Sequence, residues 1–344
     1  MAKQGNKTGR VTLMDVAREA GVSRATASLV IRKSPRVGGE TRQKVEAVLE
    51  RLGYVYNMGA ASMRAMRSNT VGVIVPNLGN PFFAELLVGI EAVLDRAGLV
   101  VLMANSQESL AKQDVFIRRM RERAVDGLIV CPASGTPVSF LRDAADWGLP
   151  FVQALRYVSE DSADYAGTDY AGGIRQAVQH LVSLGHRHIA FVTGGPKHSA
   201  REERAQGFRQ SMIDHGLDPD VSVEVSLGPS IEASGLDALL NHPARPTAAI
   251  CFNDVVAAAL SSGLYDRGIK VGSAFSVVGF DDLAEAELIR PRLTSVATFP
   301  AEIGDAAARL LLDRLESPNR PFRRSVNLPR LIERQSTGRL NDPS

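Results

Sequence analysis

From Val71 onward, short β-branched runs alternate with amphipathic segments, and this alternation limits the folds open to the chain. The first runs are VGVIV (71–75), LVVLMAN (99–105) and GLIV (127–130), and later ones extend to FSVVGF (275–280). Strands and helices alternating at this spacing form parallel sheets covered by helices on both faces. About 270 residues are too many for one such sheet. We therefore expect an α/β core of two doubly wound parallel-sheet lobes, with a ligand cleft at the carboxyl ends of the strands.

Residues 11–31 have a different pattern, which predicts two short helices joined by a tight turn. Thr12 can cap the first helix, with Asp15 as the acidic partner of a capping box, and Gly21 ends it. Ser23 can cap the second helix, and a third is expected from about 40 to 52. Three short helices around a small core predict an all-α helix-turn-helix domain.

Charge is unevenly distributed between these two parts. Residues 1–68 contain 13 Lys and Arg against 5 Asp and Glu, a net charge of +8, whereas the remainder has 27 against 33, a net charge of −6. A basic domain of this size favours a polyanion partner, although a solvated basic surface would give the same count. The helix-turn-helix pattern favours DNA.

The sequence contains, in order, the blocks VTLMDVAREAGVSRATAS, RSNTVGVIVPNLGNPFFAELLVGIE, FSVVGFDDLAEA and PRLIERQST. Together these blocks closely resemble the LacI/GalR family of bacterial regulators, of the lactose-repressor type. The resemblance implies a DNA-binding domain at 1–56 with a disordered basic start at 1–9, and a hinge helix at 57–68. It also implies a core at 69–344 like that of periplasmic sugar-binding proteins. In that core, the N-lobe would comprise about 69–167 and 299–327, and the C-lobe about 168–298 and 328–344.

DNA recognition requires short or forked polar side chains at the start of the second helix, because these reach base edges in the major groove. Arg24 is the residue that we expect to read a guanine; the alternative is a phosphate contact. In the hinge, Met63 stands where relatives usually carry Leu, and the resemblance implies that it wedges between bases in the minor groove. The complete expected DNA-binding set is Thr12, Ser23, Arg24, Ala25, Thr26, Ser28, Tyr54, Asn57, Met63 and Arg64.

Recognition of a sugar requires aromatic faces together with carboxylate, amide and guanidinium groups. The sequence Asn80-Pro81-Phe82-Phe83 predicts a capped helix start that places both Phe side chains at the cleft edge, although core packing is the alternative for either ring. The resemblance implies effector contacts from Phe82, His198, Arg204, Asn253 and Asp281. Asp281 and Arg204 are the strongest candidates, and an inter-lobe salt bridge is the alternative role for this pair. His198 and Arg204 would also suit a sugar acid.

Other functional classes find little support in the sequence. There is no GxGxxG after a strand, P-loop, GxSxG or HExxH motif, so we expect no enzyme, metal site or cofactor. Cys131 and Cys251 each end an apolar run, which predicts buried thiols, and the N-terminus resembles no signal peptide. We expect a cytoplasmic homodimer that binds operator DNA and a small effector and that has no membrane association. The alternatives are a periplasmic-type solute-binding protein and a non-specific DNA-binding protein.

Overall fold

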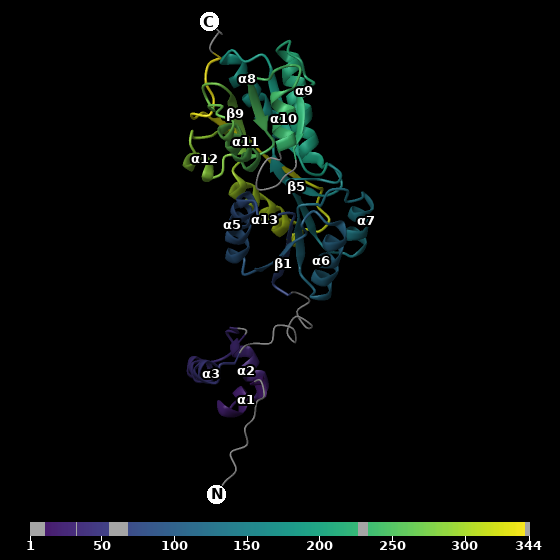
Figure 1. The fold of residues 1–344 in the computed structure, drawn as a ribbon. Helices are drawn as coiled ribbons and strands as arrows, with labels where there is room; N and C mark the ends of the chain where they lie inside the picture. The colour runs from purple at the N-terminus through teal and green to yellow at the C-terminus, as the bar shows by residue number, and fades with distance from the viewer. Residues whose placement is uncertain (1–10, 32, 55–67, 226–232, 341–344) are drawn as a thin grey trace. The chain divides into compact units, whose positions relative to one another are not determined.

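The computed structural model of the protein describes residues 11–31, 33–54, 68–225 and 233–340. Contacts between Cα atoms divide the chain into two units, residues 1–68 and 69–344, which Figure 1 shows as ribbons. None of the helices in these described ranges is long and apolar enough to cross a membrane.

The first unit contains α1 (Leu13–Glu19), α2 (Arg24–Ile31) and α3 (Gly39–Leu52). The capping box of α1 is confirmed, because Thr12 and Asp15 bond each other's backbone N–H groups. At the start of α2, the hydroxyl of Ser23 accepts a hydrogen bond from the N–H of Thr26 at 3.0 Å. All three helices contribute to one apolar core of Val16, Ala17, Ala20, Ala27, Val30, Val37, Val45 and Val48. The structure thus confirms the expected three-helix unit.

The second unit is built on two six-stranded sheets, which confirms the expected α/β core of two lobes. The first sheet is entirely parallel, with strand order β11-β5-β4-β3-β1-β2. Its strands are β1 (Thr70–Val75), β2 (Val100–Asn105), β3 (Gly127–Val130), β4 (Phe151–Ala154), β5 (Asp164–Thr168) and β11 (Arg324–Asn327).

The second sheet has the order β12-β10-β9-β8-β6-β7, and only β12 is antiparallel to its neighbour. Its strands are β6 (Ile189–Gly194), β7 (Ser222–Val225), β8 (Ala248–Cys251), β9 (Ser276–Asp281), β10 (Thr294–Ala297) and β12 (Arg330–Ile332). Cys131 and Cys251 are both free and buried near strand ends, which confirms that prediction.

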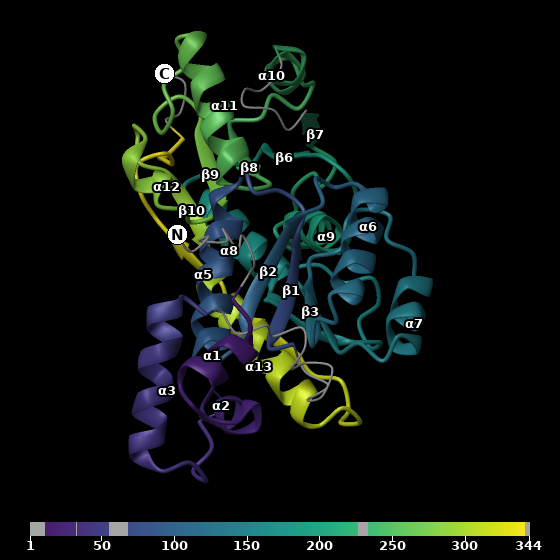
Figure 2. The same ribbon diagram turned by 90° about the horizontal axis from the view of Figure 1, so that it is seen from below.

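Helices cover both faces of each sheet, and Figure 2 shows α5 and α6 on opposite sides of β1 and β3. Around the first sheet lie α5 (Pro81–Arg96), α6 (Leu110–Glu122), α7 (Ser139–Asp146) and α13 (Pro300–Glu316). Around the second lie α8 (Tyr170–Ser183), α9 (Ser199–Asp214), α10 (Ala233–Leu240) and α11 (Asp254–Asp266), and a short helix, α12 (Glu285–Leu288), follows β9.

The chain passes between the lobes three times. It leaves the first sheet after β5, returns between β10 and α13, and leaves again between β11 and β12. The first sheet forms the N-lobe, and the second forms the C-lobe. Because the strands of each sheet run mainly in one direction, the loops at their carboxyl ends gather polar side chains at the cleft.

Candidate functional site

The start of α2 presents the side chains expected to read DNA. Ser23, Arg24 and Ala25 are exposed, and Thr26 and Ser28 are half-buried. The hydroxyls of Ser23 and Thr26 lie 2.9 Å apart, so this end of the helix is held by side chains that can also reach a base edge. That these residues contact DNA stays a prediction.

The remaining expected DNA contacts fall in two groups. Thr12 is exposed at the N-cap of α1, and Tyr54 packs partly against the core of the first unit. Asn57, Met63 and Arg64, together with most of the expected hinge helix, lie outside the described residues.

All six expected effector residues line one cavity of about 510 Å³ between the two lobes of the second unit. Phe82 and Phe83 come from the N-lobe, and the other four come from the C-lobe: His198, Arg204, Asn253 and Asp281. The local geometry follows the sequence closely, because Asn80 caps α5 by accepting a hydrogen bond from the N–H of Phe82 at 3.0 Å. Both Phe rings are largely buried and also belong to the N-lobe core, so packing and cavity lining coexist at these positions.

Two of the C-lobe residues serve as helix N-caps. His198 accepts a hydrogen bond from the N–H of Arg201 at the start of α9, and Asn253 accepts one from the N–H of Val256 at the start of α11. Burial, reinforced by nearby arginines, lowers the pKa of His198 to about 2. His198 is therefore a neutral ring at physiological pH.

Arg204 is the central cation of the cavity. Its guanidinium lies over the rings of Tyr170, Phe280 and Phe252, at 4.0, 4.3 and 4.6 Å from their centroids. One nitrogen donates to the carbonyl of Ala200 at 3.1 Å, but the buried Nε has no hydrogen-bond partner among the described residues. Such stacking fixes the plane of the guanidinium.

Asp281 ends β9 and lies 3.7 Å from Arg204, with both side chains only 6% exposed. Burial raises the pKa of Asp281 well above its usual value and lowers the pKa of Arg204, because the removal of water outweighs their attraction. The expected ion pair exists, but it joins two elements of the C-lobe rather than the two lobes. A ligand that bonds both groups would replace the water that burial has removed.

A second ion pair in the cavity wall was not expected from the sequence. Arg156 lies 2.8 Å from Glu108, and both belong to the N-lobe. Each follows closely after the carboxyl end of a strand, β4 for Arg156 and β2 for Glu108. The position of ligand sites in parallel sheets was the signal that could have identified them.

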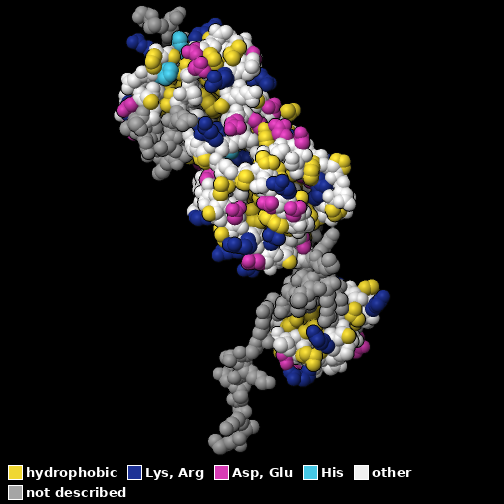
Figure 3. Space-filling view, turned by 90° about the vertical axis from the view of Figure 1, so that its right-hand side faces the viewer, with side chains coloured by type: hydrophobic (Ala, Val, Ile, Leu, Met, Phe, Trp, Pro, Cys, Tyr) yellow, Lys and Arg dark blue, Asp and Glu magenta, His cyan; other side chains and the backbone are white. Residues whose placement is uncertain are grey.

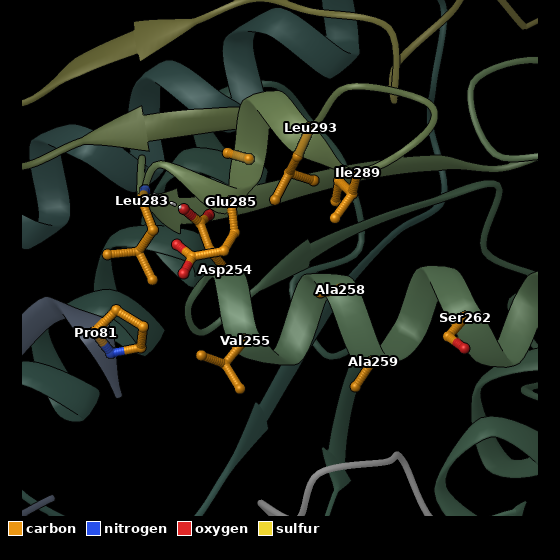
Figure 4. Close-up of a pocket in the computed structure, with 11 residues that line it drawn as sticks. Pro81, Asp254, Val255, Ala258, Ala259, Ser262, Leu283, Glu285, Ile289 and Leu293 are labelled. Atoms are coloured by element: carbon orange, nitrogen blue, oxygen red, sulfur yellow. Dashed lines mark hydrogen bonds between the residues drawn. The ribbon is translucent and has the colours of Figure 1, made fainter. Parts of the chain in front are cut away.

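A second cavity, of about 310 Å³, is mainly apolar and is shown in Figure 4. It lies between α11 and the segment 283–293, and Pro81 of α5 also lines it. Asp254 reaches it from the first turn of α11 and accepts a hydrogen bond from the N–H of Leu283 at 2.7 Å. The hydroxyl of Ser295 donates to the same carboxylate at 2.5 Å. The start of α11 therefore borders both cavities, because Asn253 lines the first and Asp254 lines the second.

Comparisons with known proteins agree with this two-part organisation. Residues 12–57 match the family described as bacterial regulatory proteins, lacI family, and residues 178–337 match a periplasmic binding protein-like domain. The HTH-type transcriptional regulator DegA of Bacillus subtilis is 33% identical over 340 residues, covering 96% of this chain and 99% of that protein. The chain belongs to the LacI family of bacterial transcriptional regulators.

Solved structures of transcriptional regulators show the same architecture. A lac repressor dimer bound to operator and an anti-inducer is 25% identical with a TM-score of 0.85, covering 96% of this chain and all of that one. A complex of the transcriptional regulator CelR with cellobiose is 29% identical with a TM-score of 0.72, covering 95% and 100%. The resemblance expected from the sequence is confirmed, and this LacI-family chain is a DNA-binding transcriptional regulator.

Proposed function

We propose that this regulator is a cytoplasmic repressor without a catalytic role, which binds a near-palindromic operator as a homodimer and responds to a polyhydroxylated effector in the inter-lobe cleft. The observation that carries the effector proposal is the buried pair of Arg204 and Asp281. One guanidinium donor there lacks a partner, and the carboxyl has a raised pKa. Vicinal hydroxyl groups can accept from the guanidinium and donate to the carboxyl group.

DNA reading is assigned to the start of α2, with Arg24 as the base-reading residue. Its exposure and its position beside the Ser23 cap suit a bidentate contact with a guanine. Thr12 and Tyr54 would contact the backbone, and Asn57, Met63 and Arg64 would act in the minor groove.

The charges in the cleft favour a neutral sugar over a sugar acid. Arg156 pairs with Glu108 in the N-lobe, and Arg204 pairs with Asp281 in the C-lobe, so each lobe compensates its own cation. His198 adds no charge because its pKa is low. An anionic effector would have to displace one carboxylate from its arginine, whereas hydroxyl groups can bond both partners without breaking a pair.

The homodimer is supported by exposed apolar side chains near the second cavity and along the edge strand β2. Val88 on α5 is 65% exposed, Val100 on β2 is 66% exposed, and Leu288 on α12 is 72% exposed. Val255 lines the second cavity and is also exposed. A C₂ dimer would cover such side chains and would match the two half-sites of a palindromic operator.

Selection of duplexes from a random pool, followed by fluorescence anisotropy, tests the DNA-binding proposal. We expect a near-palindromic site that binds at least about 10³-fold more tightly than mixed-sequence DNA. Equal affinity for all duplexes would instead support a non-specific DNA-binding protein. Sedimentation should show a dimer on this site, and a stable monomer would contradict the proposal.

A panel of neutral mono- and disaccharides, with cellobiose included, and the corresponding sugar acids tests the effector proposal. In Arg204→Met, the affinity for a sugar that changes operator binding should be about 10- to 100-fold lower, because a charged hydrogen bond is lost. Operator affinity without sugar should be unchanged. Arg209→Gln is the matched control, because Arg209 is an exposed arginine of the same helix, paired with Asp220. A normal response in Arg204→Met would contradict the cleft assignment.

A further inference from the structure

The carboxyl-terminal end of α6 carries a cluster of arginines that neither the cleft nor the helix-turn-helix unit uses. Residues 110–123 contain one Lys and four Arg against Asp114 and Glu122, a net charge of +3. Arg118, Arg119 and Arg123 are exposed, and Arg121 lies over the Trp147 ring at 4.2 Å. We call Arg118, Arg119, Arg121 and Arg123 the α6 arginine cluster.

Arg118 and Arg119 form no ion pair within the described residues, unlike several other exposed arginines of the second unit. Arg209, Arg309 and Arg323 each lie within 3.2 Å of an aspartate oxygen. No described carboxylate forms a salt bridge with Arg118 or Arg119. Their charges are therefore available to an external anion. Figure 3 looks onto the α6 side, and Lys and Arg side chains outnumber Asp and Glu along the lower margin of this unit.

The cluster lies where the chain enters the second unit. The backbone N–H of Asn69 donates to the carboxylate of Asp126 at 2.8 Å, and the N–H of Asp126 donates to the carbonyl of Thr70 at 2.8 Å. Asp126 follows Arg123 by three residues, so the end of α6 is anchored beside the first residues of β1. The 14 residues from 55 to 68 can span at most about 50 Å, whatever their conformation. Any duplex that the first unit binds is therefore joined to this end of the core by a short segment.

We propose that the α6 arginine cluster binds backbone phosphates of the DNA duplex that the helix-turn-helix unit holds. A guanidinium group can donate two parallel hydrogen bonds to one phosphate, and counterions condensed on the DNA are released when it binds. Such contacts add affinity without base preference and tie the core to the DNA. This inference rests on the proposed function, and it assigns to the core a direct share of the operator contact.

Replacement of Arg118 and Arg119 by Gln tests the proposal in the full chain. These two are chosen because Arg121 packs on Trp147 and Arg123 caps α6. The probe is a labelled 40-base-pair duplex carrying the selected site. Anisotropy is measured at several salt concentrations. Each lost phosphate contact should reduce the slope of log affinity against log salt by about 0.9, so a dimer that loses two to four contacts should lose about 2–4 in slope. Affinity near 100 mM salt should fall at least about tenfold.

Two further variants keep the result interpretable. Arg175→Gln/Arg187→Gln removes the same charge from exposed positions of the C-lobe and should leave the slope unchanged. Arg118→Lys/Arg119→Lys keeps the charge and should retain most of the slope, because Lys also binds phosphate. Thermal melting of each variant verifies the fold.

A wild-type slope in the Gln variant overturns the proposal and leaves the cluster as a solvated surface or a site for an acidic protein. An equal loss of slope in the C-lobe control also overturns it, because net charge alone would then be responsible. If selection yields no preferred site, the proposed function fails. A mixed-sequence duplex then serves as the probe, and the same comparison of slopes decides the α6 proposal.

Discussion

The buried pair of Arg204 and Asp281 predicts strong energetic coupling in unfolding experiments without ligand. Asp281→Asn leaves the Arg204 guanidinium in an apolar cage without a counter-charge, because Tyr170, Phe280 and Phe252 surround it. Removing one partner of a buried pair costs about 3–5 kcal/mol. This variant should approach that range.

The opposite single change should cost less. In Arg204→Met the apolar side chain can occupy the aromatic cage, and Asp281 can bind a proton because burial already raises its pKa. The remaining cost is that of an underbonded buried carboxyl group, about 1–3 kcal/mol. The double variant carries no buried charge at these positions and should be no less stable than Asp281→Asn alone. The coupling between the two sites should therefore be at least as large as the cost of Arg204→Met alone, about 1–3 kcal/mol.

Urea unfolding at pH 7, followed by far-UV circular dichroism, measures all four corners of this cycle in the full chain. Arg209→Gln, alone and combined with Asp281→Asn, is the control, because Arg209 lies on the same helix but pairs with Asp220 at the surface. Additive single changes, with a coupling below about 0.5 kcal/mol, would refute the argument that the guanidinium and the carboxylate compensate each other's burial.

The three described helices of the first unit could be predicted from sequence because their determinants are local. The caps formed by Thr12 and Ser23 involve side chains and N–H groups only three residues apart. Gly53 ends α3 in the left-handed conformation, with a φ of 58°. Such signals depend little on the rest of the fold.

β5 shows where sequence reasoning fails. The segment Asp164–Thr168, DYAGT, lacks a β-branched run, and no strand was predicted there. Asp164 is completely buried in the sheet, 2.9 Å from the Arg314 Nε and 2.8 Å from an Arg320 nitrogen. Both arginines are about 150 residues away along the chain. The strand therefore depends on tertiary charge compensation that no local pattern reveals.

The residues of the candidate cleft could likewise be predicted only in part. The family resemblance, together with the capped helix start at Asn80, selected six residues that line one cavity. The pairing of Arg156 with Glu108 was missed because it depends on how the loops after β4 and β2 approach each other. That approach is set by the packing of the lobe, although both positions lie at strand ends where ligand groups concentrate.

Three further predictions concern single residues. Thr12→Ala should destabilise the first unit by about 1 kcal/mol in thermal unfolding, because the capping box loses its side-chain acceptor, whereas Met14→Ala, at an exposed position of the same helix, should have little effect. Arg24→Ala should relax base preference at one position of each half-site and cost about 1–3 kcal/mol in operator binding, and uniform weakening across all operator variants would instead identify a phosphate contact. Asp254→Asn should make stability less dependent on pH. Burial raises the pKa of Asp254 to about 7, so the folded protein holds this proton more tightly than the unfolded chain does. The bound proton contributes up to about 4 kcal/mol to the free energy of unfolding. This contribution is complete below about pH 4 and is lost as the pH rises through 7. Asn can keep the bonds to Leu283 and Ser295 and has no such loss, so its melting temperature relative to the wild type should rise between pH 5 and pH 8. A difference that stays constant with pH would show that Asp254 is ionised throughout this range.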